Sequence, residues 1–462
     1  MDRLRNIRQA AYRLIVTRGN GSEVLLWAHG NAWSLPSVEI SQGQRVAEQL
    51  CAKLYAQCGF RAYCLLIPTL ADASSHCAVM EVPGESEIAS AGTCWRPLNV
   101  ATRVAMGSAD DRTVIETALA EWDECLREPN QAPFARPGWL AEMFAWVEQQ
   151  LAPLGLHLTG AFWQLNASPS FSLIRLETND SAVWFKAVGE PNRHELGVTA
   201  CVARLFPGSV PELLGIHAAW NGWLMREAPG RTLDDVPELA AWLQTAEALA
   251  RLQIESIGRE AELLDGGCMD LKLPRLIAAV DPWIDRVRVL MAAQEKQTPA
   301  PLTDLELTLL GGSLKEACSH LSDIGVPNTL GHIDFNPGNI VVSPGGCVFL
   351  DWAEACVTNP FVTFEYLRAH FRRNCTQAQT AMESLNAAYT RHWRAHMSLD
   401  DLERAAQFSS LVAVLVYAVA TSARHSFEPC GKSSAGGYLR SLARRMFREA
   451  RQIMERSDRC LA

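Results

Sequence analysis

The stretch HIDFNPGNIVVSPGGCVFLDW, residues 332–352, places polar side chains around two short β-branched runs. The runs IVV and CVF are separated by the turn residues Ser-Pro-Gly-Gly, which predicts a β-hairpin. Such a hairpin brings Asn339, just before the first arm, beside Asp351, at the end of the second arm. An amide oxygen and a carboxylate are hard oxygen ligands, suited to a Mg²⁺ ion that also binds substrate phosphates.

Asp334 lies five residues before Asn339, close enough to face the same point without sharing the metal. A carboxylate in that place can orient an attacking hydroxyl and accept its proton. Phosphoryl transfer divides its tasks in this way, with a positioned nucleophile and a metal that neutralises the phosphates. A single Asp or Asn of this kind would be read as a turn cap, but the full spacing together with the hairpin favours a catalytic site.

The pattern His332-x-Asp334-x4-Asn339, followed by the strand-borne Asp351, resembles the aminoglycoside phosphotransferase and choline kinase-like family of small-molecule kinases. The resemblance extends over about residues 155–450. It implies a two-lobed protein-kinase-like fold, with ATP and Mg²⁺ as cofactors. It also implies that Asp334 is the catalytic base, that Asn339 and Asp351 bind magnesium, and that His332 supports the backbone of the loop.

A kinase of this type also needs a lysine for the α- and β-phosphates, held by an acidic residue on a helix. Lys186 interrupts the apolar strand SAVWFKAV, where a lysine is costly unless it is paired or faces a ligand. Glu195, at the start of the predicted helix HELGVTACVARLF, is the expected partner. The alternative is an edge-strand lysine whose charge reaches solvent.

The nucleotide is expected to contact two further segments. QLNASPSFS (164–172) is interpreted as the phosphate-covering loop; because it lacks glycine, we expect Ser168 and Ser170 to donate hydrogen bonds. This departure leaves the choice between ATP and GTP open. Met225 and Glu227, in the predicted hinge, are expected near the base, although Glu227 fits a solvated linker charge equally well. Within the catalytic motif, Ile333 replaces the glycine that commonly follows the histidine.

Residues 33–60 resemble a Nudix-type element, in which helix-borne glutamates hold a divalent metal. The signature positions for glycine, arginine and glutamate are occupied here by Val38, Gln44, Ala52, Lys53, Ala56 and Gln57. Only the fold-keeping positions remain, at Leu54, Gly59 and Phe60. We therefore expect a degenerate Nudix-like α/β domain, used for packing or recognition, without a metal site or hydrolase activity. An unrelated α+β domain is the alternative.

A chain of 462 residues is expected to form several domains. We predict a degenerate Nudix-like domain at 8–126, with one helix at 44–60, and a linker at 127–138, which contains three prolines. A kinase-like N-lobe at 139–228 and a helical C-lobe at 229–462 follow, the latter with the catalytic hairpin and the acceptor site. The predicted fold class is thus α+β, a two-lobed kinase-like fold behind an α/β domain.

The charge and composition of the chain restrict the classes of molecule that it is expected to bind. A net charge of −9 and a pI of about 5.7 argue against a global nucleic-acid-binding surface. The apolar run at 411–420 is too short to span a bilayer and predicts a buried core helix. The N-terminus does not resemble a signal peptide and the 14 cysteines are scattered, which favours a cytoplasmic location. The expected partners are a nucleotide and a small-molecule hydroxyl acceptor, without nucleic acid or membrane.

From residue 361 to the C-terminus, 15 Lys and Arg stand against 9 Asp and Glu. A polycationic aminoglycoside would prefer an acidic cleft, so this balance disfavours it as the acceptor. Glu354 and Glu365 are interpreted as helix caps rather than acceptor contacts. Three arginines at helical spacing are interpreted as surface residues: Arg368, Arg372 and Arg373.

The sequence thus predicts an ATP- and Mg²⁺-dependent phosphotransferase that acts on a hydroxyl of a small molecule. One alternative is a catalytically inactive kinase-like protein that binds a nucleotide or metabolite, motivated by the loop without glycine. A second is a Nudix hydrolase with a regulatory kinase-like part, against which the lost glutamates argue. The acceptor stays open among sugars, amino alcohols, antibiotics and amino acids.

Overall fold

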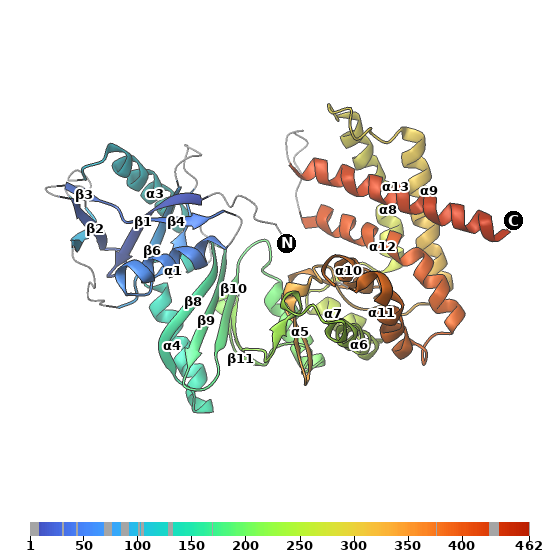
Figure 1. The fold of residues 1–462 in the computed structure, drawn as a ribbon, viewed down its shortest axis with the longest axis horizontal. Coiled ribbons are helices and arrows are strands. Elements are labelled where there is room, and N and C mark those ends of the chain that lie inside the picture. The colour runs from blue at the N-terminus through green and yellow to red at the C-terminus, as the bar shows by residue number, and fades with distance from the viewer. Residues whose placement is uncertain are drawn as a thin grey trace. The chain divides into compact units, whose positions relative to one another are not determined.

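The computed structural model describes residues 9–29, 32–42, 45–68, 76–84, 92–99, 102, 106–127, 133–168, 170–375, 377–424 and 434–461. The chain forms two compact units (Figure 1). The first, here called the β unit, joins Met1–Leu196 to Glu212–Glu227. The second, the helical unit, joins Gly197–Pro211 to Ala228–Ala462.

The first sheet of the β unit has seven strands: β1 (Gln9–Arg18), β2 (Glu23–His29), β3 (Ala32–Ser34), β4 (Ser37–Ser41), β5 (Tyr63–Leu66), β6 (His76–Glu81) and β7 (Thr93–Pro97). β1 pairs antiparallel with β2 and β4 and parallel with β6. Because successive residues of a strand face opposite sides, Leu14 packs with helix α1 (Val46–Cys58) and Ile15 with α3 (Ala109–Arg127). The sheet therefore lies between two helical layers.

The prediction of a single helix in this region is wrong, because the structure also contains α3. Its buried residues Val114, Ile115, Ala118 and Trp122 recur at helical spacing, so the pattern was present among many charged residues. On α1, the residues at the arginine and glutamate positions of the signature are all exposed: Ala52, Lys53, Ala56 and Gln57. Gly59 ends α1 in the left-handed conformation (φ 76°). Gln44 lies outside the described residues, and the Nudix-like assignment stays a prediction.

The second sheet of the β unit has the order β11-β12-β10-β9-β8. Its strands are β8 (Leu158–Ser168), β9 (Phe171–Thr178), β10 (Val183–Val188), β11 (Leu213–His217) and β12 (Gly222–Arg226). Helix α4 (Trp139–Leu151) packs on the face that carries Phe185 and Ala187, where Trp139 is fully buried. Because strand side chains alternate between faces, Trp184 and Lys186 point to the opposite face.

The two sheets of the β unit share one hydrophobic core, which contains Ile15 of the first sheet, Trp139 of α4 and Phe185 of the second sheet. Buried polar contacts join them as well. Gln164 of β8 accepts from the backbone N–H of Cys64 (2.6 Å) and donates to its carbonyl (2.9 Å). The β unit is therefore one packed body rather than two separately cored domains.

The segment predicted as a linker, 127–138, differs from that expectation where it is described. Pro133–Ala135 forms a short 3₁₀ helix in which Phe134 and Ala135 are fully buried. Trp122 of α3 donates its indole N–H to the carbonyl of Ala135 (2.7 Å). The proline-rich composition predicted a linker and gave no indication of this burial. Residues 128–132 lie outside the described part of the chain.

The helical unit contains α6 (Leu239–Glu255), α7 (Glu260–Asp265), α8 (Leu273–Ala292), α9 (Asp304–Asp323), α10 (Pro360–Asn374), α11 (Ala378–Trp393), α12 (Leu399–Arg424) and α13 (Ser434–Leu461). One small sheet is formed by β13 (Arg231–Thr232), β16 (Ile340–Ser343) and β17 (Gly346–Phe349). Another is formed by β14 (Met269–Asp270), β18 (Ala355–Thr358) and β15 (Thr329–His332). Helix α5 (Glu195–Leu205) begins in the β unit and continues into the helical unit.

Helix α12 contains the apolar run at 411–420. By length and composition alone, Leu399–Ser422 could cross a membrane. However, 56% of the 18-residue apolar window within this helix is buried inside the protein. Leu411, Val412, Leu415 and Val416 lie in the core of the helical unit. The run is thus part of a core helix, as predicted.

The described elements confirm the predicted fold class. A smaller unit built on β-sheets and a mainly helical unit make an α+β protein of the two-lobed kinase-like kind (Figure 1). The catalytic hairpin lies in the helical unit, as expected from its position in the sequence.

Candidate functional site

The predicted hairpin is formed by β16 and β17, with Val342 paired to Cys347 and Ser343 to Gly346 across the turn. This register continues to Ile340 and Phe349. One step further, the backbone N–H of Leu350 donates to the carbonyl of Asn339 (2.8 Å). The hairpin therefore brings Asn339 beside the residue that precedes Asp351, which is the fold-back expected from the sequence.

Asp334 lies at the surface of the loop between β15 and the hairpin, and two amide side chains hold its carboxylate. Asn336 donates to Oδ1 (2.9 Å), and Asn339 donates to Oδ2 (3.2 Å) and to the backbone carbonyl of Asp334 (3.1 Å). The short 3₁₀ helix Pro337–Asn339 makes these contacts possible by returning the chain toward Asp334. The carboxylate is thus held in position, yet it stays accessible to a ligand.

His332 is buried and supports the backbone on both sides of the hairpin. Its Nε2–H donates to the carbonyl of Leu350 (2.9 Å), the residue before Asp351. Its backbone N–H donates to the hydroxyl of Thr363 on α10 (3.0 Å). These contacts connect His332 to the backbone before Asp351 and to α10, and its support of the loop stays a prediction. Ile333, which replaces a glycine common in the family, has its side chain buried in the core.

Asn339 and Asp351 provide oxygen atoms suited to a magnesium ion. Because the amide nitrogen of Asn339 donates to Asp334, its amide oxygen points away from that carboxylate. Asp351 is exposed and adopts the left-handed conformation (φ 61°, ψ 67°), unusual outside glycine and tolerated by aspartate. No group of three or more His, Cys, Asp or Glu side chains that could hold a metal occurs in the described part of the chain. An amide–carboxylate pair suits a metal that takes its other ligands from phosphates and water.

In the β unit, Lys186 and Glu195 form an ion pair. Their side chains are 7% and 2% exposed, so both charges are almost fully removed from water. The ammonium also lies 5.6 Å from the ring centres of Phe171 and Trp223, near enough for a cation–π attraction. The pairing expected from the cost of a lysine within an apolar strand is present.

The turn between β8 and β9 is shorter than predicted. Most of QLNASPSFS is strand, because β8 extends to Ser168 and β9 begins at Phe171. The hydroxyls of Ser168 and Ser170 lie 3.4 Å apart, and the backbone N–H of Ser170 donates to the Ser168 hydroxyl (3.2 Å). The carbonyl of Ser170 accepts from the N–H of Gly189 (2.6 Å), which fixes this turn to the end of β10. Phosphate binding by the two serines stays a prediction.

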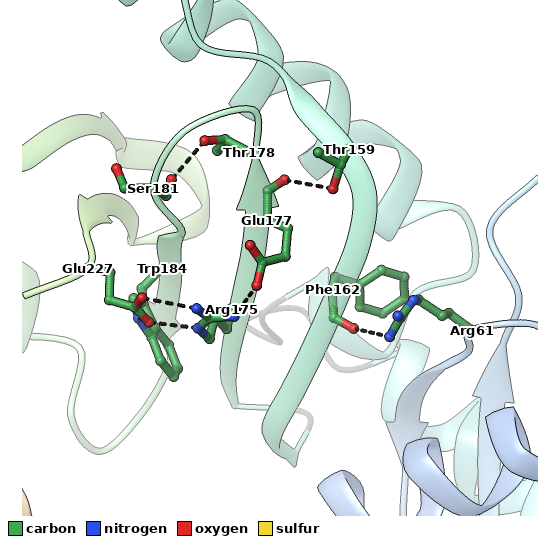
Figure 2. Close-up of polar contacts among 9 residues, drawn as sticks. All are labelled: Arg61, Thr159, Phe162, Arg175, Glu177, Thr178, Ser181, Trp184 and Glu227. Carbon is green, nitrogen blue, oxygen red and sulfur yellow. Dashed lines mark hydrogen bonds and ion pairs between the residues drawn. The ribbon is translucent and has the colours of Figure 1, made fainter. Parts of the chain in front are cut away.

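Figure 2 shows where Glu227 lies. Its carboxylate accepts two hydrogen bonds from Arg175 (2.6 and 3.0 Å) and one from the indole of Trp184 (3.0 Å). The bonds from Arg175 hold the pKa of Glu227 below its ordinary value. Glu227 is thus a sheet-bound residue and not a solvated linker charge. Met225 is paired with Trp184 across the strands, so it shares the face of Lys186; its contact with a base stays a prediction.

Sequence reasoning missed a pocket of about 350 Å³ in the helical unit that has Asp334 in its wall. The rest of the wall comes from the neighbouring loop residues and from α10, α12 and α13, and includes Tyr366, His370 and Arg372 of α10. Tyr366 and His370, four residues apart, lie on one side of α10, whereas Arg372, two residues after His370, does not share that side. Only the packing of the three helices reveals their common cavity. The prediction that Glu365 caps a helix is wrong, because Glu365 is buried within α10 and paired with Arg368.

Comparisons with known proteins find one family model that matches part of the chain. Residues 193–407, which include the loop, the hairpin and Asp351, match the model of the Phosphotransferase enzyme family. This match confirms the resemblance that the motif indicated. No curated protein matches the chain.

Solved structures of small-molecule kinases are similar at low identity. An ethanolamine kinase from Plasmodium vivax is 15% identical, with 63% of this chain and 84% of that chain covered and a TM-score of 0.44. A macrolide 2′-phosphotransferase from Brachybacterium faecium is also 15% identical, with coverages of 65% and 97% and a TM-score of 0.43. A choline kinase from Streptococcus pneumoniae is 14% identical, with coverages of 66% and 99% and a TM-score of 0.42.

Proposed function

We propose that this chain, whose residues 193–407 match the phosphotransferase enzyme family, transfers the γ-phosphoryl group of ATP to a hydroxyl of a small molecule. The catalytic loop carries the proposal. Asp334 is held by Asn336 and Asn339, and the hairpin brings Asn339 beside the residue preceding Asp351. A base next to a pair of hard oxygen ligands is the arrangement that phosphoryl transfer requires.

Asp334 is the proposed base. One carboxylate oxygen would accept the proton of the acceptor hydroxyl as that oxygen attacks the γ-phosphorus. The new O–P bond forms while the bond to the bridging oxygen breaks, and ADP leaves with that electron pair. The bonds from Asn336 and Asn339 fix the direction of the carboxylate and so support the attack geometry.

Asn339 and Asp351 are the proposed magnesium ligands, and a bound Mg²⁺ would supply charge neutralisation on the phosphates. His332 would keep this pair in register through its bond to Leu350. Lys186, oriented by Glu195, would bind the α- and β-phosphates. Ser168 and Ser170 would donate to phosphate oxygens, and Met225 would contact the base.

Replacement of Asp334 by asparagine tests the proposal. Asp334→Asn keeps the side-chain shape but removes the proton acceptor, so acceptor-dependent ADP release should fall by about 10²–10⁴-fold. Coupled measurement of ADP over a library of hydroxylated metabolites reads this out, with and without EDTA. Asp323→Asn, an exposed aspartate of the same unit, should behave as the unchanged chain.

Two results would contradict the proposal. If Asp334→Asn transfers phosphate at the unchanged rate, the base is elsewhere. If no acceptor in the library is phosphorylated and millimolar Mg-ATP gives no thermal shift, the inactive binding protein becomes the better description.

A further inference from the structure

The pocket that contains Asp334 is bounded by one loop and three helices of the helical unit. The loop contributes Ile333–Asn336, α10 contributes Glu365 to Arg373, and α12 and α13 contribute the rest of the wall. About 350 Å³ is room for a small metabolite and little for a large antibiotic. Because Asp334 is the proposed base, the acceptor must bind in this pocket, and the charges of the wall indicate which charge the acceptor carries.

Cations outnumber anions in the wall. Arg372 and Arg373 of α10 and Arg445 of α13 line the pocket, against the carboxylates of Asp334 and Glu365. Glu365 is buried, its carboxylate is paired with Arg368, and burial raises its pKa. It therefore adds little negative charge to the cavity. Arg445 is likewise paired, with Glu449, so Arg372 and Arg373 carry the positive charge that the wall offers a bound ligand.

Arg372 differs from the other two arginines in its contacts. Arg445 is paired with Glu449 (2.9 Å), and Arg373 donates to the carbonyl of Ala369 (3.0 Å). In the described part of the chain, the guanidinium of Arg372 has neither an ion pair nor a hydrogen bond. Partial burial and the neighbouring charge of Arg368 lower the pKa of Arg372, and the carboxylates of Glu365 and Glu449 act in the opposite direction. A guanidinium remains charged at neutral pH.

We propose that the acceptor is a small hydroxylated acid, with its carboxylate or phosphate bound by Arg372 and its hydroxyl at Asp334. This inference rests on the proposed function and adds the charge class of its substrate. A planar guanidinium without a protein partner matches a carboxylate or phosphate in two parallel hydrogen bonds. It disfavours cationic acceptors such as choline or an aminoglycoside by like-charge repulsion. Arg372 and Arg373 are exposed, as predicted for surface arginines, and they also line this pocket.

Neutral polar groups complete the wall. Burial lowers the pKa of His370, so the imidazole is neutral and can accept or donate a hydrogen bond. Tyr417 and Tyr438 also line the cavity, while the Ser410 hydroxyl is engaged by Glu449 (2.7 Å). Such a wall suits a polyhydroxylated or amino-substituted carbon chain between the anionic end and the reacting hydroxyl.

A matched panel of acceptors tests the charge class. ADP release would be compared for gluconate against sorbitol, for glucose 6-phosphate against glucose, and for choline and an aminoglycoside. We expect at least one acid to exceed its neutral counterpart in kcat/KM by tenfold or more. The carboxylate and phosphate arms identify which anion is bound. A preference for neutral or cationic acceptors overturns the inference while the proposed function stands.

Substitution of Arg372 tests the proposed contact between its guanidinium and the anionic group of the acceptor. Arg372→Gln should raise the KM of the acid tenfold or more, with the KM of ATP and kcat almost unchanged, and Arg372→Lys should recover part of the loss. Arg448→Gln, an exposed α13 arginine outside the pocket, is the matched control and should leave all constants unchanged. An unchanged KM in Arg372→Gln, in a variant that melts like the control, overturns the inference.

Binding measured without turnover separates this inference from the proposed function. If no acceptor is phosphorylated, gluconate and glucose 6-phosphate can still be titrated into the protein by calorimetry. Binding that Arg372→Gln abolishes and Arg448→Gln retains supports an anion pocket even if the transferase activity fails. Absence of binding by both acids overturns the inference.

Discussion

Lys186 and Glu195 form a buried ion pair whose energetic cost follows from its low exposure. Two charges that are almost completely buried have lost their hydration, and only their mutual attraction and hydrogen bonds offset that loss. Removal of one partner leaves the other charge buried and uncompensated. The pair is therefore a costly element of the β unit, which is consistent with a role in binding phosphate.

The pair predicts a distinctive pattern of stability. Lys186→Met leaves the Glu195 carboxylate buried, so we expect a loss of about 3–5 kcal/mol in the free energy of unfolding. The double variant Lys186→Met/Glu195→Gln removes both charges and should be more stable than Lys186→Met. Both variants should lose affinity for Mg-ATP. Urea denaturation and nucleotide titration measure the two effects, and equal stability of the single and double variants would contradict the expected coupling.

At the scale of elements, the catalytic hairpin is held from outside by β13, which pairs antiparallel with β16. The chain enters β13 through Gly230, which has φ 129°. A Cβ atom added there would lie 2.3 Å from the carbonyl oxygen of Val342, in the first arm of the hairpin. Only glycine permits this approach, so the position of Asn339 depends on a residue far away in the sequence.

Gly230→Ala should therefore impair catalysis, although residue 230 acts through the position of the hairpin and not through contact with a substrate. The added methyl must push β13 away from β16, and we expect a cost of about 1–3 kcal/mol together with a lower kcat/KM. Thermal denaturation and ADP release would measure the two effects. Gly345→Ala is the control, because its added Cβ would meet only the Ser343 hydroxyl, at 3.6 Å. Equal activity of the two variants would show that β13 does not position the hairpin.

Some elements could be predicted from the sequence and others could not. The hairpin could be predicted because β-branched runs and turn residues are local signals, and the Lys186–Glu195 pair because its chemistry is costly. Helix α3 was missed because its apolar residues are diluted by charged ones. The pocket around Arg372 could not be found, since it exists only where α10, α12 and α13 meet. No local pattern encodes such a meeting of helices.

At the scale of the whole molecule, the N-terminal sheet packs against the sheet that carries Lys186. Besides the shared core, the phenol of Tyr63 and the hydroxyl of Ser172 form a buried hydrogen bond (2.7 Å). Arg61 stacks on Trp163 of β8 (4.6 Å) and donates to the carbonyl of Phe162 (3.2 Å), as Figure 2 shows for the latter contact. A packing role for the N-terminal region agrees with these contacts, whatever the origin of its fold.

Because the two sheets share one core, we predict that they unfold together rather than separately. Gln164 is 1% exposed and satisfies both backbone groups of Cys64, so Gln164→Ala leaves a buried donor and acceptor unpaired. Each unpaired group costs about 1–3 kcal/mol. We therefore expect faster hydrogen exchange in β6 of the first sheet and β10 of the second to the same extent, measured by mass spectrometry. Gln57→Ala, which loses one exposed bond to Ser37, should change neither strand. Faster exchange in β10 alone would instead show that two domains open separately, as the predicted boundary at 127–138 implies.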